Sequence, residues 1–174
     1  MKKLLAALLA LAIILTACTA LADGTSYTPG MTLYVNNPDP TDRLNLRTEP
    51  SRDAHSIGKY YSGVSVELLD APQNGWAHVR IAPYEGYMDM AYLTTAHMDA
   101  SLRPTAKVRN PNAALTNIRS APSYTAEVLY TAENGEGMAV MGVTPDGWLH
   151  VQVEGIYGYI RSSLVTPEFS FAKK

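Results

Sequence analysis

The sequence predicts an all-β protein built as two small β-barrels in tandem behind an N-terminal signal segment. Three features predict this fold class: an internal repeat, short stretches in which apolar and polar residues alternate, and turn-forming dipeptides in front of those stretches. The 174 residues are enough for two small domains. Beyond the signal, no stretch shows the period of a long helix.

Residues 1–22 are predicted to be an export signal. Two lysines form a basic start, and the almost wholly apolar segment 4–17 follows. Its 14 residues are too few to cross a hydrocarbon core ~30 Å thick as a helix, but they suit a secretory signal. Two processing routes stay open. Residues 15–18 resemble a lipobox in which Cys18 would be lipidated, whereas 20–22 fits ordinary cleavage.

Both routes predict an extracytoplasmic protein, either secreted or associated with the cell envelope. In the lipobox route Cys18 would become the first residue of the mature chain and carry a lipid anchor. We therefore expect contact with the membrane only through such an anchor.

An internal repeat organises the rest of the chain. Residues 45–93 align with 117–165 at a constant offset of 72 without a gap, and 12 of the 49 aligned positions are identical. Many other positions pair one apolar residue with another. The predicted parts are barrel one at 31–95, a linker at 96–105, barrel two at 106–167 and a tail at 168–174. The linker either allows relative motion of the two barrels or joins barrels that pack tightly against each other.

Each repeat contains the alternation of half-buried strands. Residues 64–68 alternate apolar with polar, and in 76–81 the second, fourth and sixth residues are apolar and expected to face the core. The matching segment 148–153 follows the same pattern. Asn74-Gly75 and Asp146-Gly147 stand just before these strands, and such dipeptides favour tight turns with positive φ. About five short strands per repeat favour a small barrel.

The composition excludes several classes of function. Cys18 is the single cysteine, so the folded region has no disulfide, no thiolate nucleophile and no cysteine metal ligand. Without the two lysines of the signal, 12 basic residues stand against 16 acidic ones, for a net charge of −4. The basic residues are scattered, whereas a nucleic-acid surface needs them clustered. We therefore expect no nucleic-acid partner.

Motifs of catalysis or metal binding are absent from the sequence. It contains no His-Glu-x-x-His, no Gly-x-Ser-x-Gly and no Walker loop. His55, His78, His97 and His150 do not have the paired spacing of metal ligands. The carboxylates are spread over loops, and nothing selects an acid–base pair. The sequence therefore predicts a non-catalytic protein without cofactor or metal.

Three motifs are present in both repeats. The first is Asn-Leu-Arg-Thr-Glu-Pro-Ser at 45–51, the second is Asn-Gly-Trp-Ala-His-Val at 74–79, and the third begins with Gly-Tyr at 86–87. Their counterparts follow in the same order in the second repeat. Together these motifs resemble the bacterial SH3 domain family, and the resemblance covers roughly 31–167.

The resemblance implies an SH3-like barrel of five to six strands in each repeat. It also implies extracellular binding, often to peptidoglycan or its cross-bridge peptides. Members of the family commonly accompany wall hydrolases, but we expect no catalytic domain in this chain.

Trp76 and Trp148 are the strongest candidates for ligand contact. Each begins a strand, on the face opposite the apolar row. A large aromatic ring in that place can stack on a peptide or a sugar. The alternative is structural: the tryptophan covers the barrel end or packs on the arginine of the Asn-x-Arg motif.

Tyrosines extend the predicted site. The resemblance places a groove tyrosine at Tyr92, where the second repeat has Leu164, so repeat one is expected to be the better binder. Further tyrosines are expected to add aromatic surface: Tyr60, Tyr61 and Tyr84 in repeat one, and the Gly-Tyr residues Tyr87 and Tyr159 of the two repeats.

Two further pairs of equivalent residues lie near the tryptophans in the sequence. Arg47 and Arg119, of the Asn-x-Arg motif, are expected to cap backbone carbonyls or to stack on a tryptophan. His78 and His150 are expected on the tryptophan face, either simply solvated or tuning ligand binding with pH.

The predicted function is that of a non-catalytic extracellular binding protein that recognises peptidoglycan or its peptides, with repeat one as the main ligand module. Two alternatives stay open. The barrels could form an adaptor that binds a partner protein in the cell envelope, or a structural spacer without a dedicated ligand.

Overall fold

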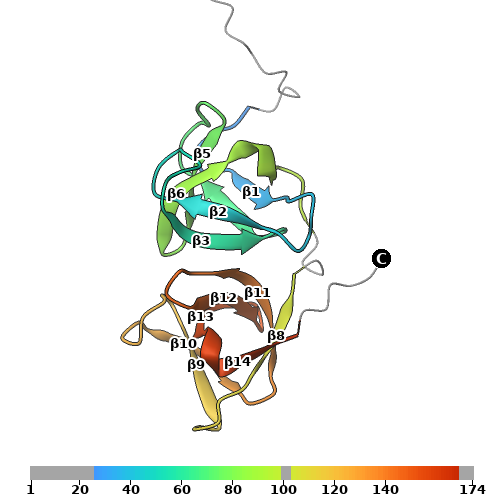
Figure 1. Ribbon diagram of the computed structural model, residues 1–174, viewed down its shortest axis with the longest axis vertical. Helices are drawn as coiled ribbons and strands as arrows, with labels where there is room; N and C mark the ends of the chain where they lie inside the picture. The colour runs from blue at the N-terminus through green and yellow to red at the C-terminus, as the bar shows by residue number, and fades with distance from the viewer. Residues whose placement is uncertain (1–25, 99–102, 169–174) are drawn as a thin grey trace, which may run out of the picture.

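The computed structural model describes residues 26–98 and 103–168, which form two β-barrels stacked along the long axis of the molecule (Figure 1). The predicted signal with Cys18, linker residues 99–102 and residues 169–174 lie outside the described part. Within that part, no helix is long and apolar enough to cross a membrane.

Barrel one consists of seven short strands paired in the order β3-β2-β6-β5-β4-β1-β7. All of its neighbouring strands are antiparallel. A 3₁₀ turn, η1 (Met90–Tyr92), connects the sixth strand to the seventh. The strands are β1 (Thr32–Val35), β2 (Arg43–Arg47), β3 (Ser56–Tyr61), β4 (Ser65–Leu68), β5 (Trp76–Ile81), β6 (Tyr84–Asp89) and β7 (Leu93–Thr94).

Barrel two repeats this plan in the order β10-β9-β13-β12-β11-β8-β14. The 3₁₀ turn η3 (Ser162–Leu164) stands where barrel one has η1. The strands are β8 (Thr105–Val108), β9 (Leu115–Arg119), β10 (Val128–Glu133), β11 (Gly137–Val143), β12 (Trp148–Val153), β13 (Ile156–Arg161) and β14 (Val165–Glu168).

The all-β tandem fold is therefore confirmed, with more strands than the five or six per repeat implied by the family resemblance. The added strand follows the 3₁₀ turn and pairs with the first strand of its barrel, as β7 does with β1. With only two residues, β7 is too short for an alternating pattern to reveal it.

Each barrel has its own hydrophobic core. The alternation predicted for β5 is confirmed, because Ala77, Val79 and Ile81 are buried while the intervening side chains are partly or fully exposed. In β12 the pattern is broken: Trp148 and His150 are buried although they lie on the opposite face. Other parts of the molecule must therefore cover that face of barrel two.

A strand pairing joins the two barrels. In Figure 1, β3 at the lower edge of barrel one lies beside the upper edge of barrel two, and β3 pairs antiparallel with β11 through Tyr60 and Gly142. Tyr60 packs in the core of barrel one, where Met141 of barrel two joins it. The next residue, Tyr61, packs in the core of barrel two. Neighbouring side chains of one strand thus contribute to different cores.

Side chains reinforce this junction. The buried Arg103, at the end of the linker, donates from its guanidinium to the carbonyl oxygen of Gly63 in barrel one. The hydroxyl of Tyr159 in barrel two donates to the carbonyl oxygen of Ala82 in barrel one, at 2.9 Å. The linker was expected either to allow relative motion of the barrels or to join barrels that pack tightly. In the structure the two barrels pack tightly against each other.

Candidate functional site

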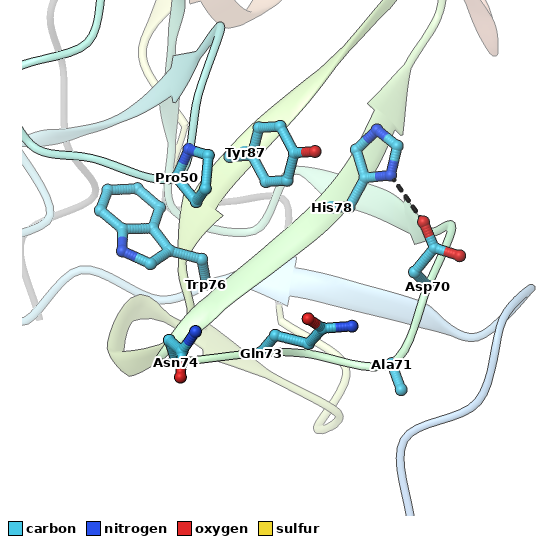
Figure 2. A pocket seen from close by; sticks show the side chains of 8 residues that line it. All are labelled: Pro50, Asp70, Ala71, Gln73, Asn74, Trp76, His78 and Tyr87. Atoms are coloured by element: carbon cyan, nitrogen blue, oxygen red, sulfur yellow. Dashed lines mark hydrogen bonds and ion pairs between the residues drawn. The ribbon is translucent and has the colours of Figure 1, made fainter.

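Trp76 stands between two adjoining hollows on the surface of barrel one. The first hollow has a volume of about 250 Å³ and the second about 240 Å³. The partly exposed indole forms a wall of both. Eight residues line the first hollow, which Figure 2 shows: Pro50, Asp70, Ala71, Gln73, Asn74, Trp76, His78 and Tyr87.

A tight turn positions Trp76. Gln73 and Trp76 exchange two backbone hydrogen bonds, each 2.9 Å long. Between them, Asn74 has φ = 51° and Gly75 has φ = 82°, so both central residues adopt the left-handed conformation of a type I′ turn. The turn predicted from Asn74-Gly75 is therefore confirmed. It fixes the first residue of β5 and places the side chains of Gln73 and Asn74 at the rim of the hollow.

A stacked pair of rings forms another wall of the first hollow. His78 and Tyr87 face each other across β5 and β6, with ring centroids 4.8 Å apart and planes at 18°. Nδ1 of His78 lies 2.8 Å from Oδ2 of Asp70, the contact drawn as a dashed line in Figure 2. Each of these three side chains is thus held by a neighbour.

The second hollow brings together Tyr92 and an ion pair. Arg52 lies 2.8 Å from the carboxylate of Asp89, whose other oxygen accepts from the backbone N–H of Ala91 in η1. Tyr92 also borders a third hollow of about 370 Å³ near Asn37. The three hollows follow one another around Trp76 and Tyr92, and we call this surface the barrel-one groove.

The arginines of the Asn-x-Arg motif make the same structural contact in both repeats. The guanidinium of Arg47 donates to the carbonyl oxygen of Ala54 at 2.7 Å, and Arg119 donates to that of Ala126 at the same distance. The expectation that these arginines cap carbonyls is confirmed. Each bond ties a loop to the strand that precedes it.

The equivalent groove of barrel two is partly covered. Trp148 is only 4% exposed. Tyr124 packs against its ring at 5.2 Å, and the guanidinium of Arg161 lies 5.5 Å from the ring centroid. The remaining hollow beside Trp148 and Leu164 has about 180 Å³. Trp148 therefore packs on an arginine, as the structural alternative expected, but this is Arg161 of β13 rather than Arg119.

Two other predicted ligand residues lie in the junction between the barrels. Tyr60 and Tyr159 are each 1% exposed, so the expectation that Tyr60 widens an exposed groove is wrong, and Tyr159 has no open surface either. Tyr84 approaches Tyr159 edge-on at 6.3 Å, while Tyr61 is buried in the second core. Burial raises the pKa of both Tyr60 and Tyr159, which keeps the two phenols neutral.

His150 is buried in the same junction, so the expectation of a solvated histidine is wrong for repeat two. Its ring stacks on Tyr159 at 4.7 Å with planes at 14°, and Tyr60 meets it edge-on. Burial, and next the positive charge of Arg103, lower the pKa of His150 to about 4. The imidazole is therefore neutral at physiological pH.

Of the predicted ligand set, the structure brings Trp76, Tyr87 and Tyr92 together in the barrel-one groove and puts Tyr60, Trp148 and Tyr159 elsewhere. Sequence reasoning missed the polar residues of the groove. Gln73 stands next to the predicted turn and could have been found from it, whereas Asp70, Arg52 and Asp89 belong to no motif and become neighbours only in the folded barrel. In the described ranges, no group of three or more His, Cys, Asp or Glu side chains could hold a metal ion.

Comparisons with known proteins agree with this architecture. A family model described as "Bacterial SH3 domain" matches residues 42–94 and 113–166. The chain is 27% identical over 129 residues, 70% of its length, to "Putative N-acetylmuramoyl-L-alanine amidase YrvJ" of Bacillus subtilis (strain 168), of which the match spans 24%.

Solved structures of NlpC2 and NlpC1 from Trichomonas vaginalis are similar over 81% of this chain, with 20% identity and a TM-score of 0.39 in both cases. The match spans 49% and 47% of those chains. The chain thus spans about a quarter of the curated relative and about half of each solved protein.

Proposed function

The chain belongs to the bacterial SH3 domain family, and from this premise we propose that it is a non-catalytic extracytoplasmic protein that binds peptidoglycan or its peptides through barrel one. One observation carries the proposal: Trp76 is a partly exposed wall shared by two hollows, whereas its counterpart Trp148 is covered. The curated relative bears the name of an N-acetylmuramoyl-L-alanine amidase, which supports a wall polymer as the ligand.

The barrel-one groove has the chemistry that such a ligand needs. An indole ring gives a wide apolar contact and loses little conformational entropy on binding. Arg52 and Asp89 offer a cation and an anion side by side, and both charges occur on peptides with free amino and carboxyl groups. The tight turn before Trp76 and the hydrogen bonds around His78 hold the site in shape, which lowers the cost of binding.

Barrel two is proposed to support barrel one rather than to bind independently. Its tryptophan is covered, and its histidine and tyrosine lie in the junction. One ligand site per chain follows, so avidity from two equivalent sites on one polymer is not expected.

An adaptor function is the second candidate, favoured by the surface of barrel two. All the exposed large hydrophobic side chains of the described residues belong to this barrel, and some of their counterparts in barrel one are polar, such as Arg52 for Tyr124 and Glu85 for Tyr157. Exposed apolar residues of this kind are common in protein interfaces. They are Leu115, Tyr124, Val128, Leu129 and Tyr157.

A pull-down with purified sacculi tests the proposed function. Residues 23–174, the chain without its predicted signal, would be compared with Trp76→Ala and with Tyr157→Ala, an exposed aromatic of barrel two that does not cover Trp148 and serves as the matched control. Saturable binding that becomes about tenfold weaker in Trp76→Ala and stays unchanged in Tyr157→Ala is expected. Absence of binding by the folded wild type would contradict the wall-binding function. Capture of an envelope protein that Tyr157→Ala abolishes would then favour the adaptor.

A further inference from the structure

The first hollow beside Trp76, which we call the Trp76–Tyr87 hollow, has a counterpart in barrel two that already holds a partner. At the repeat offset, Asp70, His78 and Tyr87 correspond to Gly142, His150 and Tyr159. Both histidine–tyrosine pairs stack in nearly the same way, at 4.8 Å and 18° in barrel one and at 4.7 Å and 14° in barrel two. The two surfaces are therefore built alike.

In barrel two this surface receives barrel one itself. Tyr60 lies edge-on to His150 with centroids 6.2 Å apart, and the hydroxyl of Tyr159 donates to the carbonyl oxygen of Ala82. The backbone of β3 pairs with β11 at Gly142. The histidine–tyrosine stack thus acts as a docking surface in the one place where the structure shows it occupied.

A strand cannot dock in the same way on barrel one. A Cβ atom at Gly142 would lie 2.6 Å from the Tyr60 ring and 2.7 Å from the carbonyl oxygen of Lys59, so this close approach requires glycine. Barrel one has Asp70 at that position. Moreover, β11 extends to Val143, whereas β4 ends at Leu68. Pro72, which follows soon after, has no N–H to offer to a strand.

The groups that line the Trp76–Tyr87 hollow suit a sugar. Trp76 and Pro50 offer apolar surfaces for the C–H face of a pyranose ring (Figure 2). Gln73 and Asn74 supply amide groups that both donate and accept, and the hydroxyl of Tyr87 does the same. The hydroxyl and acetamido groups of an N-acetylated amino sugar need this mixture of donors and acceptors.

Asp70 adds a carboxylate that His78 holds through one of its two oxygens. Its Oδ2 is engaged by Nδ1 of His78, and its Oδ1 can accept from a sugar hydroxyl. Because His78 is itself stacked on Tyr87, the acceptor is oriented before the ligand binds. A site prepared in this way loses little entropy when it is filled.

We propose that the Trp76–Tyr87 hollow binds one pyranose ring of the glycan strand, with Trp76 stacking on the sugar and with Asp70, Gln73 and Asn74 forming hydrogen bonds to its hydroxyl and acetamido groups. This inference rests on the proposed wall-binding function and narrows it, since the hollow then recognises the sugar part of peptidoglycan rather than its peptide.

The test is a titration of residues 23–174 with tri-N-acetylchitotriose, followed by the indole N–H signals in an NMR spectrum of the ¹⁵N-labelled protein. The chain has two tryptophans, so the spectrum separates the two barrels directly. The Trp76 signal is expected to shift with saturation while the Trp148 signal stays in place. Asp70→Asn, which keeps the shape of the side chain, and Gln73→Ala are expected to weaken binding several-fold.

Glu85→Gln is the matched control, because Glu85 is an exposed carboxylate of the same barrel that pairs with Arg80 outside the hollow. It is expected to bind as the wild type does. A second titration with a soluble wall peptide completes the design.

The outcomes separate this inference from the proposed function. Binding to sacculi that depends on Trp76, without any response to chitotriose, overturns the sugar site and leaves the wall-binding function standing. Shifts of the hollow's signals by the wall peptide instead of the sugar overturn it in the same way. Failure to bind either sacculi or chitotriose overturns both. Chitotriose binding that Asp70→Asn does not weaken contradicts the role given to the carboxylate.

Discussion

The surfaces around Trp76 and Trp148 occupy equivalent places in two barrels of the same strand order, yet they are used differently. In barrel one the indole borders two hollows, and the histidine–tyrosine stack beside it is open. In barrel two Tyr124 and Arg161 cover the indole, and barrel one covers the stack. One repeat leaves this surface open, while the other uses it to join the barrels.

A few substitutions account for this difference. Gly142 in place of Asp70 admits β3, and Arg161 in place of Asp89 brings a guanidinium over Trp148 rather than an ion pair beside it. Both barrels keep the same strand order despite these changes. The comparison teaches that side chains at the rim, rather than the fold, decide whether the surface around the tryptophan stays open.

The largest effect is expected when the junction is forced apart. Gly142→Val would push a side chain into the backbone of Lys59 and the ring of Tyr60, and we expect a loss of about 3 kcal/mol in the free energy of unfolding. Gly137→Val is the matched control in the same strand, since a Cβ there meets nothing within 4 Å. Urea denaturation measures both. Equal stabilities of the two variants would show that β3 and β11 do not need this close approach.

The buried histidine of the junction should make stability depend on pH. The pKa of His150 is lowered to about 4 in the folded protein from 6.5, so the unfolded chain takes up the proton first as the pH falls. The contribution of His150 is fully present above the unfolded pKa and is lost toward the folded one. We expect a loss of about 2 kcal/mol between about pH 6.5 and pH 4.5.

Chemical denaturation at several pH values, compared with His150→Gln, measures this dependence. The variant lacks the titrating ring and is expected to lose less stability across the same interval. Parallel profiles of wild type and variant would mean that the imidazole of His150 is not held neutral by its surroundings.

Exchanging rim residues should convert one groove into the other. In Arg52→Tyr/Asp89→Arg, barrel one receives the residues that cover Trp148, and the new side chains are expected to pack over Trp76. Binding to sacculi should become about tenfold weaker, because the aromatic wall is no longer available. The measurement is a pull-down with thermal unfolding beside it. Unchanged binding by the folded double variant would show that cover over Trp76 does not control access.

The smallest effect is expected from a single hydroxyl. Tyr159→Phe removes the hydrogen bond to the carbonyl oxygen of Ala82 and should cost about 1 kcal/mol of unfolding free energy. The matched variant Tyr87→Phe, on the open surface of barrel one, should leave the stability unchanged. Denaturation measures the stability of both variants. Equal losses would contradict the difference between the His150–Tyr159 stack, which barrel one covers, and the His78–Tyr87 stack, which is open.

Much of the fold could be predicted because it depends on local pattern. The alternation of Ala77, Val79 and Ile81 and the turn at Asn74-Gly75 are both found where expected. Both features depend on residues that are close together in the sequence. The internal repeat also shows each sequence pattern a second time. The carbonyl contacts of Arg47 and Arg119 are likewise local, because each bond spans seven residues.

The site was predicted less completely because it depends on contacts between distant segments. Nothing near Tyr60 or Tyr159 in the sequence indicates that another barrel buries them. Arg161 covers Trp148 from a neighbouring strand, at a position where the two repeats differ. Strand alternation predicts which way a side chain points, but it does not predict what lies on that side.

The most direct test of the difference between the barrels is the response of the two indole N–H signals to peptidoglycan fragments released from sacculi by a muramidase. The Trp76 signal is expected to shift with saturation and the Trp148 signal to stay unchanged. A shift of the Trp148 signal alone, or equal shifts of both, would contradict the assignment of ligand binding to barrel one.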